Sequence, residues 1–176
     1  SGDVSTVVES ASGLGLAVER TMTWDASGYG GHCGTAVDAP AQRWYFAEGS
    51  QGFFDTYLLL ANPGSATAHV GVTFLLEGLP PVVRHLDVSP SSRATVFAGD
   101  VAGLAGQAFS IVVDSDAPVI AERAMYWSGA GTFWLGGHES AGVEAPARRW
   151  THAEGATGAF FDTYLLLANP NEESTE

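Results

Sequence analysis

Apolar and polar positions alternate along the middle of the chain. Between residues 69 and 76, every second residue is large and apolar: Val70, Val72, Phe74 and Leu76. Side chains of a β-strand point alternately to opposite faces, so this pattern predicts a strand that is buried on one side. Further apolar runs occupy residues 82–88, 94–98, 110–114 and 119–127. Turn-forming residues separate these runs at 62–64, 77–81, 90–92 and 114–118.

The spacing of these runs predicts an all-β fold. Seven or eight strands at intervals of ~8–12 residues are typical of an antiparallel, immunoglobulin-like β-sandwich. Residues 100–107 hold the one expected helical turn, and no long amphipathic helical pattern favours a parallel α/β sheet. Leu58, Leu59 and Leu60 are consecutive, which predicts a strand that is buried on both faces.

Several stretches of the sequence occur twice. Residues 53–63, which read FFDTYLLLANP, recur unchanged at residues 160–170. Trp44 recurs as Trp150, 106 residues later, and one inserted residue then widens the offset to 107. Upstream, ERTMTW at residues 19–24 matches ERAMYW at residues 122–127. A period of about 106 residues is the size of a whole sandwich domain rather than of a solenoid repeat.

This period divides the chain into three parts. Residues 44–149 are predicted to form a complete sandwich module, preceded by the closing part of another module at 1–43 and followed by the opening part of a third at 150–176. An expected strand at 163–169 carries Leu165, Leu166 and Leu167, and exposed apolar strand edges recruit other strands. We therefore expect head-to-tail docking of C-terminal strands on the N-terminal strands of the next copy. The alternative is that the chain continues beyond residue 176.

Composition narrows the classes of function. The chain has 176 residues and a net charge of −13, which disfavours nucleic acid and anionic membranes as partners. All seven basic residues are arginines, so the chain lacks the lysine that Schiff-base and P-loop chemistry require. Cys33 is the single cysteine and allows no disulfide within the chain. No apolar run reaches the ~18 residues of a membrane helix, so no membrane insertion is expected.

The repeated motifs AERAMYW (121–127), GGH (136–138), WYFAEG (44–49) and FDTYLLLANP (54–63) resemble a repeat of large secreted bacterial proteins. The resemblance covers essentially the whole chain. It implies tandem immunoglobulin-like modules at the cell surface, without catalytic activity or catalytic residues. The chain departs from the repeat where Cys33 occupies the position of Glu139, and where Thr151 and His152 replace Tyr45 and Phe46.

The candidate charged and histidine residues favour structural roles. Glu122 and Arg123, like their copies Glu19 and Arg20, are adjacent in a strand, so each needs a separate partner. A buried or interfacial ion pair is the favoured interpretation. The two glycine-flanked histidines, His32 and His138, occur once per module, which does not match a metal-binding pair. No Gly-x-Ser-x-Gly elbow occurs, and we do not expect an enzyme.

The acidic turns could supply oxygen ligands for calcium, at residues 25–28 and 114–116, although neither matches a calcium loop. No other cofactor is expected. Asp55 and Asp162 precede identical strands, so we expect both at equivalent positions, each anchoring a turn.

The aromatic residues leave two functions open. Trp127, Phe133 and Trp134 surround one glycine-rich turn and could form a platform on which sugars stack. A plug in the core or at the junction between modules is the favoured interpretation of these rings. The sequence therefore predicts a structural or adhesive extracellular module whose partners are copies of itself or adjacent modules. Carbohydrate binding, with a surface polysaccharide as partner, is the alternative.

Overall fold

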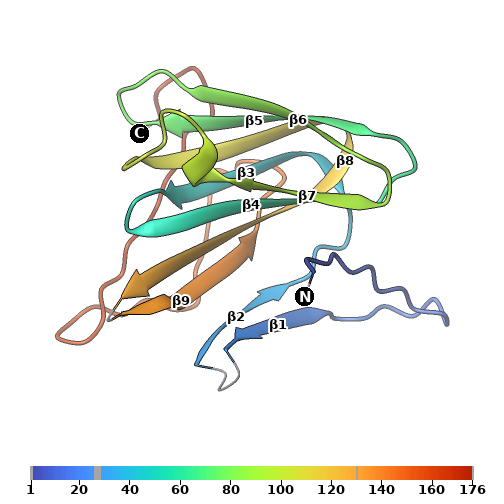
Figure 1. The fold of residues 1–176 in the computed structure, drawn as a ribbon, viewed down its shortest axis with the longest axis horizontal. Coiled ribbons are helices and arrows are strands. Elements are labelled where there is room, and N and C mark those ends of the chain that lie inside the picture. Colours follow the sequence, from blue (N-terminus) through green and yellow to red (C-terminus); the bar gives the residue numbers. More distant parts are fainter. Residues whose placement is uncertain (1, 26–28, 130, 176) are drawn as a thin grey trace.

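The computed structural model describes residues 2–25, 29–129 and 131–175 (Figure 1). Its strands are β1 (Glu19–Trp24), β2 (Gly30–Thr35), β3 (Ala41–Ser50), β4 (Phe54–Asn62), β5 (Ala68–Leu76), β6 (Val82–Val88), β7 (Ser92–Phe97), β8 (Ala108–Gly129) and β9 (Thr132–Ala141). A 3-10 turn, η1 (Ala98–Asp100), shares only Asp100 with the helical turn expected at residues 100–107, and residues 101–107 form bends and turns. All strand pairs are antiparallel, and the predicted all-β sandwich is confirmed.

Strand β8 connects the two layers of the sandwich. Its first half pairs with β5 and β3, and its second half pairs with β4 and β9. One layer therefore has the order β6-β5-β8-β3, and the other has the order β7-β4-β8-β9. The shared strand crosses between the layers in Figure 1.

The expected turn at residues 114–118 is wrong, because these residues lie inside the 22-residue strand β8. In the pairing with β3, Arg43 is opposite Asp114 and Ala41 is opposite Val119, so the register shifts between them. Pro118 lies within this shift, and proline, which cannot donate to a ladder, is tolerated at such irregularities. The turn-forming residues therefore mark the place where β8 leaves one layer and enters the other.

The core fills the space between the layers. Val70, Val72 and Phe74 are almost fully buried, as the alternation predicts. Leu58 and Leu60 are each 1% exposed, whereas Leu59 is half-buried, so the leucine strand is fully buried on one face only. Large apolar side chains buried in this way supply most of the stability of such a domain.

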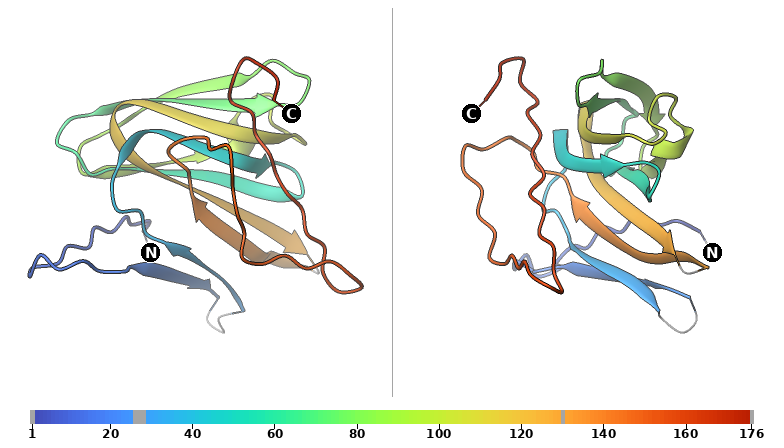
Figure 2. Two further views of the ribbon diagram at one scale, coloured as in Figure 1. Left: turned by 180° about the vertical axis from the view of Figure 1, so that it is seen from behind. Right: turned by 90° about the vertical axis from the view of Figure 1, so that its left-hand side faces the viewer.

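Two parts of the chain lie outside the sandwich. Strands β1 and β2 form a separate two-stranded sheet, the N-terminal hairpin, which lies beyond β9 (Figures 1 and 2). Residues 142–175 hold no strand and follow an extended path along the outside of the sandwich (Figure 2). The expected strand at 163–169 is therefore extended chain without a ladder partner.

Candidate functional site

The N-terminal hairpin and the hairpin of β8 and β9 are copies of each other in register as well as in sequence. Trp24 pairs with Gly30 in the first hairpin, and Trp127 pairs with Gly136 in the second. In each, the tryptophan ring lies so close to the glycine that an added Cβ would lie 2.2 Å from a ring atom. Only glycine leaves room for such a ring, so the Gly-Gly-His motif serves packing within each hairpin.

The two hairpins contact each other through an ion-pair cluster. Nη1 of Arg20 lies 2.9 Å from Oε2 of Glu122, and Nη2 of the same arginine contacts Glu139. The Glu139 side chain is only 1% exposed. Burial raises the pKa of this carboxyl, the nearby Glu122 charge raises it further, and the Arg20 charge opposes both. The Arg20 charge therefore offsets part of the cost of burying an ionised Glu139 carboxylate at this contact.

Aromatic residues extend the contact. The indole N–H of Trp24 donates to the carbonyl oxygen of Trp134 at 2.7 Å, and the hydroxyl of Tyr29 donates to that of Phe133 at 2.6 Å. The Trp24 ring meets Tyr126 edge-on, with ring centroids 5.4 Å apart. Such pairs contribute about 0.5–1.5 kcal/mol beyond the area that they bury.

His32 lies in the same contact. Its Nε2 is 3.1 Å from the hydroxyl of Tyr126. Burial lowers the pKa of this histidine, and the charge of Arg20 lowers it further. Both effects favour the neutral imidazole, which is hydrogen-bonded to Tyr126 at the contact between the two hairpins.

The predicted aromatic platform does not form one surface. Trp134 stacks between Tyr126 and Phe133, with centroids 4.5 and 4.7 Å away. Trp127 is adjacent to Tyr126 in β8 and so points to the opposite face, where it packs against Phe54. Of the three platform residues, Phe133 alone is largely exposed, at 68%. Trp134 also has a positive φ of 50°, a conformation rare for a large side chain, which its stacking partners hold.

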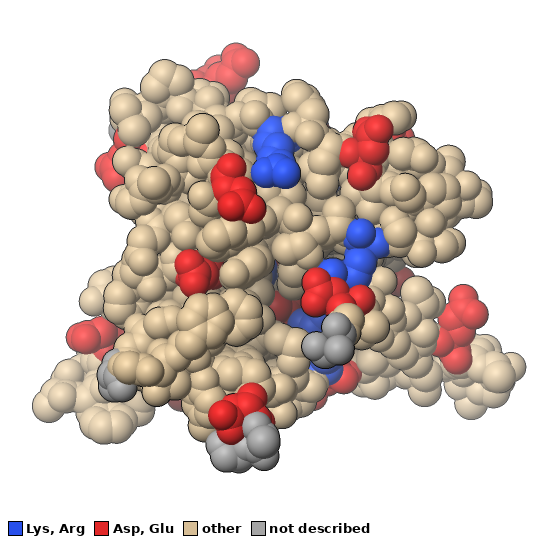
Figure 3. Space-filling model, in the orientation of Figure 1, with Lys and Arg blue, Asp and Glu red and all other residues tan. Residues whose placement is uncertain are grey.

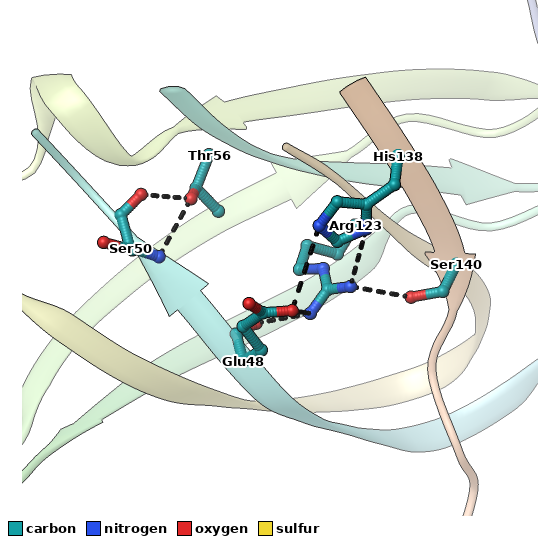
Figure 4. Close-up of polar contacts among 6 residues, drawn as sticks. All are labelled: Glu48, Ser50, Thr56, Arg123, His138 and Ser140. Atoms are coloured by element: carbon teal, nitrogen blue, oxygen red, sulfur yellow. Dashed lines mark hydrogen bonds and ion pairs between the residues drawn. The ribbon is translucent and has the colours of Figure 1, made fainter. Parts of the chain in front are cut away.

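Arg123, the copy of Arg20, lies in a separate buried network (Figure 4). Its Nη1 donates to the carbonyl oxygen of Glu48 at 2.8 Å and lies 3.3 Å from Oε2 of that residue, while Nη2 donates to Oγ of Ser140 at 3.1 Å. His138 lies on the other side of the guanidinium, 3.4 Å from Nη2. Burial lowers the pKa of His138, and the Arg123 charge lowers it further, so both favour the neutral imidazole.

Glu122 and Arg123 thus have separate partners, on the outer and inner sides of the sheet. The sequence analysis missed both acidic partners. Glu48 recurs as Glu154, just as Arg123 recurs as Arg20. The recurrence of an acidic residue together with an arginine could have indicated an ion pair. The counterpart of Glu139 is Cys33, so the repeat gave no indication of the role of Glu139. Cys33 is an exposed residue with a free thiol.

The turn before β4 is built in the same way in both copies. The backbone N–H of Ser50 donates to the Thr56 hydroxyl at 3.1 Å, and that of Ala156 donates to the Thr163 hydroxyl at 3.0 Å. Each hydroxyl donates back to the carbonyl oxygen of the same partner. The threonine thus closes the turn in both copies.

Asp55 lies at this turn as well. Its Oδ1 accepts from the Gln51 side chain at 3.3 Å, and its Oδ2 accepts from the Trp134 indole at 3.4 Å. Asp162 is exposed on the extended C-terminal segment. Both oxygens of the Asp55 carboxylate therefore accept hydrogen bonds from side chains of the sandwich.

The acidic residues proposed as calcium ligands are engaged by protein groups. Asp114 pairs with Arg43, and Asp116 accepts the backbone N–H of His69 at 2.8 Å. Residues 26–28 of the other candidate turn lie outside the described residues. Across residues 2–25, 29–129 and 131–175, no group of three or more His, Cys, Asp or Glu side chains is placed to hold a metal ion. Figure 3 shows acidic side chains scattered over one face with few basic ones between them.

Comparisons with known proteins bear on the fold. Protein 1070 of Thermotoga maritima has a similar structure, with a TM-score of 0.55 and 23% identity, over 60% of this chain and 96% of that one. A sensory rhodopsin transducer of Anabaena aligns with a TM-score of 0.43 and 24% identity, over 50% of this chain and 86% of that one. No family model matches, and no curated protein matches. The described part of the chain holds no helix with the length and apolar character needed to cross a membrane. The first likeness shows the fold alone.

Proposed function

We propose that this chain is a structural or adhesive module of an extracellular tandem array, without catalytic activity. Adjacent units join through their repeated hairpins into a surface stalk or a head-to-tail filament. The observation that carries the proposal is the contact between the two hairpins. It joins the closing hairpin of one repeat to the sandwich of the next through an ion-pair cluster and aromatic contacts.

The contact is heterologous, because the two hairpins use different faces. Arg20, Trp24 and their equivalents Arg123 and Trp127 occupy corresponding positions in the repeat. In the first hairpin, these side chains contact the next unit, whereas Arg123 and Trp127 point into their own sandwich. When a contact joins two different faces, each unit still has one face of each kind free, so the contact can be repeated from unit to unit.

The experiment that tests this role measures how firmly the N-terminal hairpin is held. The double variant Arg20→Ala/Tyr29→Phe removes the ion pairs and one hydrogen bond at the contact. Hydrogen exchange at the β2 amides should then accelerate towards that of an isolated hairpin, since two-stranded sheets alone are marginal. The matched variant Thr21→Ala/Thr23→Ala changes the other face of β1 and should leave the rates unchanged. Equal exchange in both variants would contradict a role for this contact in joining units.

The location is tested separately. Antibodies raised against the chain should label intact cells of the producing organism without permeabilisation. Labelling only after permeabilisation would refute the extracellular part of the proposal.

Carbohydrate binding remains the second candidate because Phe133 presents an exposed ring stacked on Trp134. Sugars stack on exposed aromatic rings, which offer apolar area at low entropic cost. A glycan array probed with the full chain and with Phe133→Ala tests it. Binding that the substitution abolishes would favour this function, and an array without binding would leave the structural proposal alone.

A further inference from the structure

We infer that residues 161–169 of one copy bind as a strand along the free edge of β1 in a second copy, in the register that β4 has with β8. This inference rests on the proposed head-to-tail function and deepens it. It names the strand that docks, the edge that receives it and the pairing of their residues.

The pairing is present once inside the molecule. Strand β4 runs antiparallel to the second half of β8, with Phe54 opposite Trp127 and Leu58 opposite Arg123. The sequence of β4 recurs unchanged in residues 161–169, and β1 keeps the Glu, Arg, Met and Trp of that half of β8. Transferring the register places Phe161 opposite Trp24 and Leu165 opposite Arg20.

The receiving edge is available. Within the described chain, β1 pairs with β2 and with no other strand. In Figure 1, β1 is the outermost strand of the N-terminal hairpin, on the side away from β9. Residues 19–23 are exposed. A strand edge with unpaired N–H and C=O groups is a template for another strand.

The docking segment is available as well. Leu165 and Leu167 are 75% and 91% exposed, whereas their counterparts in β4 are each 1% exposed. The segment already has the local shape of β4: the Thr163 hydroxyl closes the preceding turn, and the Asn169 side chain donates to the carbonyl oxygen of Glu173 at 2.7 Å. Asn62 makes the same bond to Ala66 at 2.7 Å. A segment shaped before binding loses less conformational entropy when it binds.

The charges at the two sites fit the same pairing. In the sandwich, Glu48 of β3 contacts the buried Arg123 of β8, the strand with which β4 pairs. The corresponding Glu154 is exposed, and the turn between it and the docking segment is equivalent to the turn between Glu48 and β4. Docking brings this carboxylate towards Arg20, whose side chain is 45% exposed and has donors left for a further acceptor.

The partner is a second copy rather than the same chain. A heterologous contact that is repeated from unit to unit adds each new unit head-to-tail, in the same direction. Within one molecule, residues 161–169 follow the outside of the sandwich and form no ladder with β1 (Figure 2). Pairing of this segment with β1 of a second copy links successive molecules.

Cysteine pairs test the register directly. In a Cys33→Ala background, Thr21→Cys is combined with Tyr164→Cys, which corresponds to the observed pair of Ala124 and Tyr57. Residues opposite each other in antiparallel strands have Cα atoms about 4.5–5.5 Å apart, within the range of a disulfide. The matched control combines Thr23→Cys with Tyr164→Cys, a diagonal pair whose Cα atoms should lie about 7–8 Å apart, beyond the usual range of a disulfide. Tyr164 is 78% exposed, and Thr21 and Thr23 are exposed as well, so none of these substitutions disturbs the fold.

After mild oxidation, the first pair should give a ladder of disulfide-linked oligomers on a non-reducing gel, and the control should lose it. Mixing chains that carry only Thr21→Cys with chains that carry only Tyr164→Cys should give the heterodimer. Equal cross-linking by both pairs, or a cross-linked monomer alone, would overturn the inference. If the ladder is missing while electron microscopy shows filaments, the register is wrong and the proposed assembly stands. A chain that stays monomeric throughout a concentration series in light scattering overturns both.

Discussion

Replacing Arg123 by methionine should cost the sandwich about 3 kcal/mol of unfolding free energy. The Arg123 side chain is 8% exposed, and its guanidinium bonds to the backbone and side chain of Glu48 and to Ser140. Methionine keeps much of the aliphatic stem and removes the guanidinium. Removing one member of a buried ion pair costs roughly 3–5 kcal/mol, because the other charge stays buried without its partner. The Glu48 side chain is 26% exposed and keeps some water, which places the cost at the lower end.

The same substitution at Arg43 is the matched control. Arg43 also pairs with a carboxylate of the sandwich, but its side chain is 58% exposed and that of Asp114 is 47% exposed. Exposed ion pairs contribute about 0–1 kcal/mol, since water screens them. Urea unfolding followed by circular dichroism should therefore separate the two variants by about 2 kcal/mol or more. In a thermal scan, Arg123→Met should lower Tm by about 6–12 °C.

A double-mutant cycle with Glu48→Gln tests the cause. If the cost comes from the unpaired carboxylate, Arg123→Met should be less harmful when Glu48 is already neutral. Equal costs for Arg123→Met and Arg43→Met, or full additivity with Glu48→Gln, would refute the buried-pair explanation.

Three further predictions use the repeat or the histidine pKa. Leu58→Ala should lower the unfolding free energy by about 2–5 kcal/mol, whereas Leu165→Ala should leave that of the monomer unchanged, as measured by urea unfolding. Thr56→Val should cost about 1–3 kcal/mol by leaving buried backbone groups unpaired, and Thr163→Val should cost almost nothing in the same assay. The pKa of His138 is lowered in the folded chain, so its contribution is complete above about pH 6.5 and is lost as the pH falls towards the folded value. His138→Gln should reduce the loss of stability below about pH 6.5, and an unchanged pH dependence would show that the imidazole does not titrate as argued.

Much of the sandwich could be predicted from the period of its apolar residues. The alternation from Val70 to Leu76 and the run at residues 82–88 coincide with β5 and β6. The residues at 114–118 could not be interpreted correctly in this way. A turn and a strand that crosses between layers both interrupt the ladder, so both favour Asp, Ser and Pro. Long-range pairing with β3 and β5 distinguishes the two cases, and local sequence does not contain it.

The candidate site was predictable in its residues but not in its partners. Recurrence identified Arg20 and Arg123 as equivalent, yet one contacts Glu122 and Glu139 across a hairpin contact while the other contacts Glu48 within the sandwich. A charged side chain bonds to whichever acceptor the tertiary fold brings near, and no local pattern encodes that choice.

The repeated leucine strand shows why identical sequence does not give identical structure. Residues 54–62 and 161–169 are the same in sequence, and both keep the hydrogen bonds formed by their threonine and asparagine side chains. Only the first is a strand, because β7 and β8 supply the backbone groups on its two sides. Local chemistry therefore determines the turns at each end, and the neighbours determine whether the leucines are buried. A strand sequence that is shaped at both ends and unpaired along its length should pair with an edge that offers the β8 pattern, which is why we propose β1 of a second copy as its partner.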